Sequence, residues 1–248
     1  MAIDVAIQDG VMSIAFARPE KKNAITAAMY AAMADALRAA SIEDAVRTVV
    51  IAGTSGVFTA GNDLGDFLAN PIVDLDHPVV QFMDAFVDLD KPVIGAVTGH
   101  AVGVGVTLLL HCDLVYLAEG AIFTMPFVGL GLVPEFGSTY LLPQRLGHAR
   151  AAEHLLLGEP MSAADALAYG LVNAVLPPAE VIPRALHTAA RLGALSADAL
   201  QASKRLLRGP QREATRHAIR AEAEVFVERL RSPEARAALR AFFERRGA

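Results

Sequence analysis

The feature that most constrains the fold of this chain is the alternation of short apolar runs with amphipathic stretches up to about residue 175. Residues 4–7 and 12–17 have the pattern of two strands, and the dipeptide Asp9-Gly10 between them is typical of a hairpin turn. Strands that alternate with helices favour an α/β domain with mainly parallel pairing. Three further apolar runs are predicted to be strands: residues 47–52, 92–97 and 114–117.

Helical patterns lie between these strands. Thr26 can cap a helix over residues 27–40, apolar residues recur at helical spacing over residues 79–86, and residues 106–110 can start another helix. Residues 68–78 contain two prolines and several aspartates, and we expect them to form a mobile loop. After Pro177-Pro178 the chain is predicted to be helical to its end. We therefore divide it into an α/β core, residues 1–195, and a C-terminal helical segment, residues 196–248.

Composition disfavours several classes of function. The net charge of −5 argues against a generic polyanion binder, and the absence of Trp argues against an aromatic platform for nucleic acid. No apolar run approaches the roughly 20 residues of a membrane helix. The single cysteine excludes an intrachain disulfide, and the N-terminus lacks the pattern of a secretory signal. We expect a cytoplasmic protein with no nucleic-acid or membrane partner.

The basic residues are concentrated toward the C-terminus. From Ser196 onward there are 12 Lys and Arg, of 22 in the chain, against seven acidic residues. Two interpretations are open: a solvated, salt-bridged helical surface, or a segment that lies partly near a phosphorylated ligand.

Two kinds of site can be set aside. The glycines around Gly103 lack the spacing of a dinucleotide-binding or phosphate-binding loop. The potential metal ligands at residues 111–113 and 74–77 lack the spacing of a known metal site, so we expect no metal.

Four segments, however, carry characteristic residues that occur together, in the same order, in one group of enzymes. Taken together, they resemble the crotonase (enoyl-CoA hydratase/isomerase) superfamily over essentially the whole chain. The segments are R-P-E-K-K-N-A at 18–24, A-G-N-D-L at 60–64, K-P-V-I followed by glycine-rich residues at 91–105, and 158–172 with its final G-L-V.

The resemblance implies a spiral of ββα turns whose C-terminal helices cover the active site and support a homotrimer or a dimer of trimers. It also implies an acyl-CoA substrate, with no cofactor beyond the CoA moiety. The backbone N–H groups of Asn62 and Val104 are at the positions that form an oxyanion hole for the thioester. Such donors stabilise the negative charge that develops on the thioester oxygen.

The same positions suggest contacts for the substrate. Arg18 and Lys21 are candidates for the CoA phosphates, and Ala24 and Ala60 belong to the matching CoA-contacting segments. An apolar pocket for the acyl group is expected from residues in or near these segments: Leu64, Val79, Phe82, Met83, Phe86 and Phe127.

The resemblance includes enzymes that catalyse different reactions. Hydratases of this family carry two glutamates at positions that here hold Thr107 and Phe127, neither of which can replace a carboxylate in acid–base work. Glu135 instead matches the single glutamate of the Δ3,Δ2-enoyl-CoA isomerases. Its neighbours are mostly apolar, so its pKa should be raised. The expected reaction is therefore a 1,3-proton shift on a 3-enoyl-CoA, with Glu135 as the only proton carrier and no role for Thr107.

Other functions stay open at this point. An enoyl-CoA hydratase with unusual residues is the main alternative. Ring-CoA isomerases and dehalogenases of the same fold place an acid near the position of Glu135, and a non-enzymatic CoA-binding module would bind without turnover.

Overall fold

The computed structural model describes residues 2–54, 56–70 and 76–247. Its larger sheet has the strand order β1-β2-β3-β5-β7-β10, in which every neighbouring pair except β1 and β2 is parallel. This arrangement confirms the prediction of an α/β domain with mainly parallel strands. The strands are β1 (Ile3–Gln8), β2 (Val11–Phe16), β3 (Thr48–Ala52), β5 (Val93–Val97), β7 (Leu114–Ala118) and β10 (Ala174–Leu176).

Local sequence explains the main features of this sheet. Asp9 and Gly10 both have positive φ, +49° and +78°, as expected of a tight turn that joins antiparallel β1 and β2. Every residue of β3 and β5 is buried. Continuous apolar strands of this kind are typical of parallel sheets whose two faces are both covered by helices.

A second, smaller sheet was not predicted. Its strand order is β4-β6-β8-β9, and β4, β6 and β8 follow β3, β5 and β7 along the chain. The chain therefore makes successive turns of one strand in each sheet, with helical segments between the turns, as the expected spiral requires. The strands are only two or three residues long: β4 (Val57–Thr59), β6 (His100–Val102), β8 (Ile122–Thr124) and β9 (Met161–Ser162).

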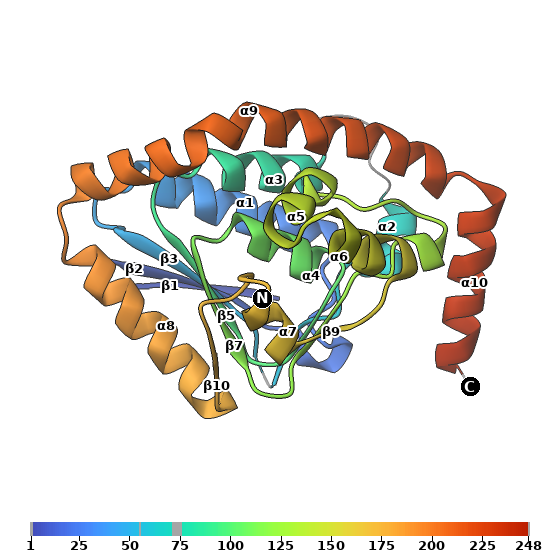
Figure 1. Cartoon of the computed structure of the whole chain (residues 1–248), viewed down its shortest axis with the longest axis horizontal. Coiled ribbons are helices and arrows are strands. Elements are labelled where there is room, and N and C mark those ends of the chain that lie inside the picture. The colour runs from blue at the N-terminus through green and yellow to red at the C-terminus, as the bar shows by residue number, and fades with distance from the viewer. Residues whose placement is uncertain (1, 55, 71–75, 248) are drawn as a thin grey trace.

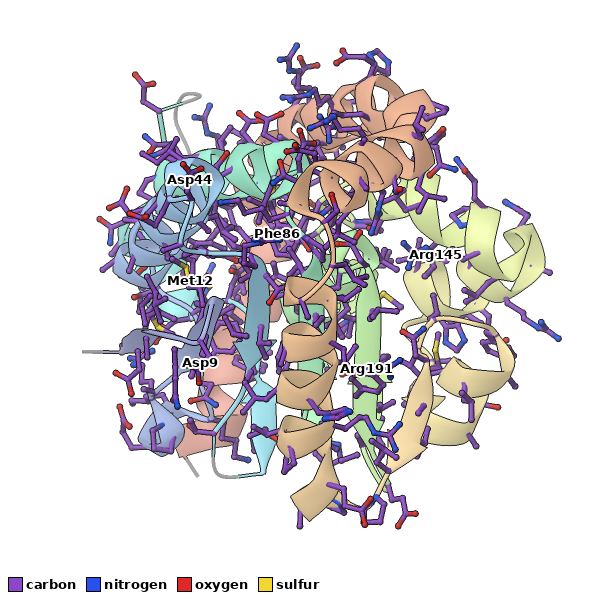
Figure 2. The ribbon with its side chains drawn as sticks, turned by 90° about the vertical axis from the view of Figure 1, so that its left-hand side faces the viewer. Asp9, Met12, Asp44, Phe86, Arg145 and Arg191 are labelled. Atoms are coloured by element: carbon purple, nitrogen blue, oxygen red, sulfur yellow. The ribbon has the colours of Figure 1, made fainter. Side chains whose placement is uncertain are left out.

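Helices cover both faces of the larger sheet (Figure 1). Helices α1 (Ala27–Ile42) and α3 (Pro78–Asp88) pack against each other, α8 (Pro178–Gly193) packs on β3, β5 and β7, and α9 (Ala197–Leu230) contacts α3 and α5. Viewed from the side, α8 carries Arg191 on the outside, and Phe86 lies in the interior beneath α9 (Figure 2). The remaining helices are α2 (Leu64–Ala69), α4 (Val104–Thr107), α5 (Ser138–Leu146), α6 (His148–Ala152), α7 (Ala163–Ala168) and α10 (Pro233–Gly247).

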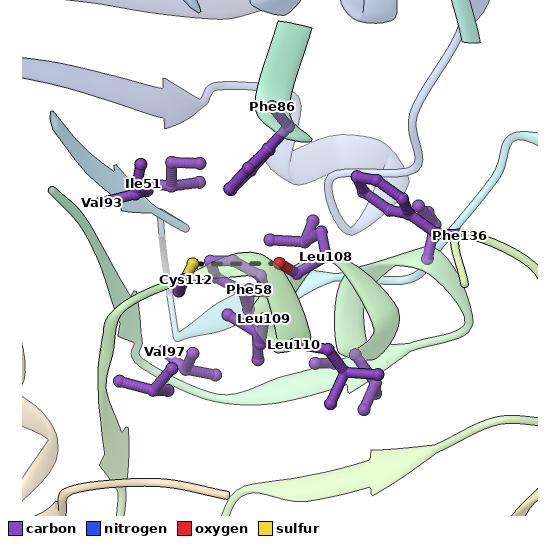
Figure 3. Close-up of a cluster of buried hydrophobic side chains, with 14 of the residues drawn as sticks. Ile51, Phe58, Phe86, Val93, Val97, Leu108, Leu109, Leu110, Cys112 and Phe136 are labelled. Atoms are coloured by element: carbon purple, nitrogen blue, oxygen red, sulfur yellow. Dashed lines mark hydrogen bonds between the residues drawn. The ribbon is translucent and has the colours of Figure 1, made fainter. Parts of the chain in front are cut away.

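One part of the core brings together residues of several turns of the spiral. The 3₁₀ turn Leu108–His111 follows α4, and its three leucines are buried among strands and α3 (Figure 3). Cys112 ends this turn, and its thiol contacts the carbonyl oxygen of Leu108 at 3.9 Å. Phe86 and Phe136 approach the same cluster from α3 and from the loop before α5.

Two local predictions differ from the structure. The expected loop at residues 68–78 is wrong at its start, because α2 continues to Ala69; residues 71–75 lie outside the described residues. The side chain of Asp63 caps α2 by accepting hydrogen bonds from the N–H groups of Gly65 and Asp66. The helix expected at residues 106–110 begins earlier, at Val104, and becomes a 3₁₀ turn at Leu108.

The C-terminal helix α9 is held on the core by its basic side chains. Lys204 is 2.8 Å from the carboxylate of Asp113, and Arg208 donates hydrogen bonds to the backbone oxygens of His111 and Cys112. Arg212 pairs with Asp90 at 2.7 Å. Many of the basic residues of α9 therefore form ion pairs with the core. The division of the chain into a core and a C-terminal segment at residue 195 stays a prediction. In the described part of the chain, no helix combines the length and apolar character needed to span a membrane.

Candidate active site

A cavity of about 480 Å³ lies at the N-terminal end of α4, next to the loop between β4 and α2. Asn62 and Val104 both line it, and Phe226 of α9 forms part of its wall. The structure thus brings the two residues predicted for the oxyanion hole to the same cavity. Other residues on this wall are Lys21, Lys22, Ala24, Ala60, Leu64 and Phe127.

The backbone explains why the N–H groups of Asn62 and Val104 are available to a ligand. Val104 is the first residue of α4, so its N–H has no acceptor within the helix. The N–H of Ile25 donates to the carbonyl oxygen of Gly61, and the carbonyl oxygen of Ile25 accepts from the N–H of Asp63, both at 2.8 Å. Neither bond uses the N–H of Asn62, which lies between these two residues. Within the described ranges, neither the Asn62 nor the Val104 N–H donates to a protein acceptor.

The side chain of Asn62 is also held in place. The hydroxyl of Tyr30, which is buried in α1, donates a 2.6 Å hydrogen bond to Oδ1 of Asn62. Burial and the nearby charge of Glu135 raise the pKa of Tyr30 well above its ordinary value, so the phenol stays protonated and remains a donor. Sequence reasoning missed this contact, since nothing near Tyr30 distinguishes it from an ordinary core aromatic residue.

A second cavity, of about 590 Å³, adjoins the first. It lies between α3 and α9, and Asn62, Phe67 and Phe226 line both cavities. The rings of Phe67 and Phe226 meet edge to face with 5.7 Å between their centroids. Glu135 lines this second cavity and not the first, so Asn62 is the N–H donor that shares a cavity with the carboxyl group.

Glu135 is a buried carboxyl group, with only 7% of the residue exposed. Burial raises the pKa of Glu135 to about 8, the hydroxyl of Thr107 opposes this effect, and the charge of Glu222 adds to it. The Thr107 hydroxyl donates to Oε1 of Glu135 at 2.5 Å. A carboxyl group with a pKa near neutrality can both take and return a proton.

Thr107 was predicted to have no role in the reaction, but it contacts the carboxyl group of Glu135. Its position could have indicated this contact, because it lies two residues after Gly105, where the hydratases carry a glutamate. That spacing identifies a side chain directed at the reacting part of the site, whatever its chemical type.

The backbone immediately after Glu135 has an uncommon conformation. Phe136 has a φ of +61° and Gly137 a φ of +72°, so two successive residues are in the left-handed region. This conformation costs a non-glycine residue roughly 1–2 kcal/mol. It ends the loop and begins α5, whose N-cap is Gly137.

Of the residues predicted to contact CoA, three line the first cavity: Lys21, Ala24 and Ala60. Arg18 does not line it. Its guanidinium donates to the carboxylate of Asp63 at 2.7 Å and to the carbonyl oxygen of Ala24 at 3.0 Å, and so joins the loop to the N-terminus of α2. Lys22, an exposed side chain, lines the cavity instead.

The residues predicted for the acyl pocket fall into three groups. Leu64 and Phe127 line the first cavity, whereas Val79 and Met83 line the second. Phe82 and Phe86 line neither cavity: both are buried against Phe136, with ring centroids 5.7 and 6.0 Å away. A helical stripe of apolar residues could not distinguish the cavity wall from the core behind it.

Comparisons with known proteins relate the chain to one family of enzymes. A family model described as enoyl-CoA hydratase/isomerase matches residues 6–248. Human enoyl-CoA delta isomerase 2 is 37% identical over 225 residues, which cover 88% of this chain and 57% of the human protein. The 2,3-dehydroadipyl-CoA hydratase of Escherichia coli (strain K12) is 32% identical over 246 residues, covering 98% and 95% of the two chains.

Solved structures extend the likeness to the fold. The structure of Pseudomonas aeruginosa OdaA superposes with a TM-score of 0.95 at 49% identity, covering 97% of this chain and 98% of that one. The present chain spans little more than half the length of the human relative. The curated relatives are named for different reactions, an isomerisation and a hydration.

Proposed function

Because the chain belongs to the enoyl-CoA hydratase/isomerase family, we propose that it is an isomerase that converts 3-enoyl-CoA thioesters to 2-enoyl-CoA thioesters. The observation that carries this proposal is a buried carboxyl group, Glu135, in a cavity that Asn62 also lines, where the backbone N–H groups of Asn62 and Val104 have no protein acceptor in the described ranges. The name of the human relative supports the same reaction.

In the proposed mechanism, the thioester oxygen accepts hydrogen bonds from the N–H groups of Asn62 and Val104. The carboxylate of Glu135 removes a proton from C2, and the electrons of the C–H bond form a dienolate whose negative charge lies on the thioester oxygen. The double bond moves from C3–C4 to C2–C3 as Glu135 returns the proton to C4. Loss of one oxyanion donor in a comparable site costs about 2.7–4 kcal/mol of transition-state stabilisation.

The two cavities suggest how the substrate lies. The CoA moiety occupies the first cavity beside Lys21 and Lys22, whose charges suit phosphate groups. The acyl chain continues past Asn62 into the second cavity, where Val79 and Met83 supply apolar surface. Proton transfer within one carbon chain needs no metal or redox cofactor, so we propose none beyond the CoA moiety of the substrate.

Hydration is the alternative reaction, and the relative from Escherichia coli is named for it. Hydration needs one group to activate water and another to protonate the product carbon. Glu135 is a single carboxyl group, and Thr107 and Phe127 stand at the positions of the hydratase glutamates. The geometry therefore favours isomerisation.

We further propose that the chain forms a homotrimer or a dimer of trimers, as the family resemblance implies. Exposed apolar side chains, among them Leu156 and Leu157 at 61% and 76% exposure, offer surface for such contacts. Light scattering should give a multiple of three protomers, and a stable monomer at micromolar concentration would contradict the proposal. The cytoplasmic location stays a prediction from sequence.

The reaction is tested by assaying the protein with 3-hexenoyl-CoA and crotonyl-CoA side by side. Isomerisation of the first substrate should greatly exceed hydration of the second. Glu135→Gln keeps the shape of the side chain but removes the base, so isomerisation should fall by about 10²–10⁴-fold. In deuterated water the wild type should exchange the C2 proton of a bound acyl-CoA, and the variant should not.

Affinity separates this chemistry from simple binding. The Kd of the variant for a saturated acyl-CoA should stay within about threefold of the wild-type value, since backbone amides hold the thioester. Near-wild-type isomerisation by Glu135→Gln, or hydration as fast as isomerisation, would overturn the assignment.

A further inference from the structure

The peptide group that joins Phe136 to Gly137, directly after Glu135, is held on both sides by residues from distant parts of the chain. Its carbonyl oxygen lies 2.7 Å from Nε2 of His111, and its N–H donates to Oε2 of Glu222 at 2.6 Å. His111 ends the 3₁₀ turn after α4, and Glu222 lies in the C-terminal half of α9. One peptide plane is thus fixed between the core of the spiral and the C-terminal helix.

From this arrangement we infer that His111 and Glu222 are positioning residues for Glu135: they hold the left-handed turn that directs its carboxyl group into the second cavity. The inference rests on the proposed function, because it assigns these residues to the proton transfer by Glu135. Neither side chain needs to touch the substrate. Their effect passes through the orientation of a single peptide group.

Glu222 is suited to this role because both oxygens of its carboxylate accept hydrogen bonds from the start of α5. Besides the Gly137 N–H, it accepts the backbone N–H of Thr139 at 2.8 Å and the Thr139 hydroxyl at 2.5 Å. The residue is 6% exposed, and in the described part of the chain its carboxylate forms no ion pair. A buried carboxylate accepting three donors at the start of α5 compensates the N–H groups that the first turn of a helix leaves free.

His111 is suited to hold the other side of the peptide. Burial lowers the pKa of His111 to about 3, so the imidazole is neutral, and a carbonyl acceptor requires that Nε2 carry its proton. The imidazole also stacks on the ring of Phe136, with centroids 3.9 Å apart and planes at 21°. The side chain and the carbonyl group of Phe136 are therefore both fixed by one residue.

The two contacts oppose the natural tendency of this segment. A phenylalanine leaves the left-handed region readily, and rotation of the Phe136–Gly137 peptide would turn the preceding carboxyl group away from Thr107 and Asn62. Misplacement of a catalytic group by about 1 Å can cost roughly 100-fold in rate. A change in either contact should therefore lower turnover more than it lowers affinity.

Three variants test the inference. His111→Phe keeps an aromatic ring against Phe136 and removes only the hydrogen-bond donor. Glu222→Gln leaves one acceptor oxygen and brings an NH₂ group against N–H donors. Thr139→Val, a milder change, removes one of the three donors to Glu222. Glu228→Gln, an exposed position on the same helix, is the matched control for loss of a negative charge from α9.

Two measurements are made first on the wild type: isomerisation of 3-hexenoyl-CoA, and exchange of the C2 proton of a saturated acyl-CoA in deuterated water. Absence of isomerisation by the wild type would refute the proposed function itself and is distinguishable from failure of this inference. With an active wild type, His111→Phe and Glu222→Gln should lower the maximal exchange rate roughly tenfold to a hundredfold, while Kd changes less than threefold. Thr139→Val should lower the rate severalfold, and Glu228→Gln should behave as the wild type.

The pH profile separates positioning from a general structural role. Glu222→Gln should move the midpoint of the exchange profile to lower pH, since it removes a negative charge that acts on Glu135. Tyr30, Thr107 and Glu222 act directly on Glu135, and the charged residues Asp84, Arg216, Arg220 and Glu224 line the same cavity. His111→Phe changes none of these charges, so its midpoint should stay in place. Unchanged rates in folded His111→Phe and Thr139→Val, or equal losses of rate and affinity, would overturn the inference even if Glu222→Gln failed to fold.

Discussion

The hydroxyl of Thr107 donates a 2.5 Å hydrogen bond to Oε1 of Glu135, within a part of the protein where neither residue is more than 7% exposed. A donor of this kind favours the ionised form of a carboxyl group. The base and its donor come from adjacent turns of the spiral, and their contact forms only when α4 packs beside the loop that leads to α5.

Thr107→Val should therefore raise the pKa of Glu135 still further and lower isomerisation at neutral pH. A hydrogen bond to a charged group is worth about 1.5–3 kcal/mol, which corresponds to a loss of roughly tenfold or more at pH 7. Steady-state kinetics from pH 6 to pH 10 should show partial recovery at high pH. Thr98→Val is the control, because the buried Thr98 hydroxyl has no hydrogen-bond partner among the described residues and its removal should leave activity unchanged.

The pH dependence of the wild-type enzyme follows from the raised pKa of Glu135, about 8. The base must be ionised in the free enzyme, so kcat/KM should rise about tenfold per pH unit at low pH and level off above about pH 8. A profile of kcat/KM for 3-hexenoyl-CoA checks this. A value that falls between pH 6 and pH 8 would show that a protonated group, rather than a carboxylate, starts the reaction.

Glu135→Gln should stabilise the folded protein in alkaline solution. The folded pKa of Glu135 is about 8, above the roughly 4.3 of an unfolded glutamate, so unfolding releases a proton between these values. The contribution of this group to wild-type stability is thus complete below about pH 4.3 and is lost as the pH rises toward 8. Melting curves at pH 5 and pH 8 should show an advantage of the variant that grows with pH; a constant difference would contradict burial of an ionisable group.

Gly61→Ala should impair turnover through the backbone beside Asn62. Gly61 has a φ of +82°, and a Cβ atom there would lie 2.7 Å from the backbone oxygen of Val102. Strand β6 ends at Val102, so neither partner can move without displacing an oxyanion donor. Loss of one such donor corresponds to about 10²–10³-fold in kcat. Gly129→Ala, where the added atom meets nothing, should have wild-type kinetics.

Sequence patterns predicted five of the strands of the larger sheet and the long helices because each of these elements is encoded locally; β10 was not predicted. Strands β3 and β5 are buried apolar runs, and Thr26 accepts the N–H of Met29 at the start of α1, as its position before an apolar helical stripe indicates. The smaller sheet was missed because its strands are too short to show a period. Its pairing depends on close contact between successive turns of the spiral, which no single segment specifies.

Sequence patterns pointed to the backbone N–H donors and the carboxyl group of the candidate site, but not to the residues that hold these groups in place. Asn62, Val104 and Glu135 stand in recognisable segments. Tyr30 and Glu222 do not: they lie 32 and 85 residues from the groups they bind, and each resembles an ordinary helical residue. Arg18 shows the opposite error, since a cation in a matching segment is used to hold Asp63 and not to line the cavity.

The attachment of α9 limits insertions and deletions within this helix. Arg208 fixes the helix to the backbone of His111 and Cys112. Further along, Glu222 holds the turn after Glu135, and Phe226 lines both cavities. An α-helix turns about 100° and advances about 1.5 Å per residue. Inserting or deleting one residue between Arg208 and Glu222 would rotate both of the later side chains off the site. The number of residues in this stretch is therefore set by the distance between two parts of the core.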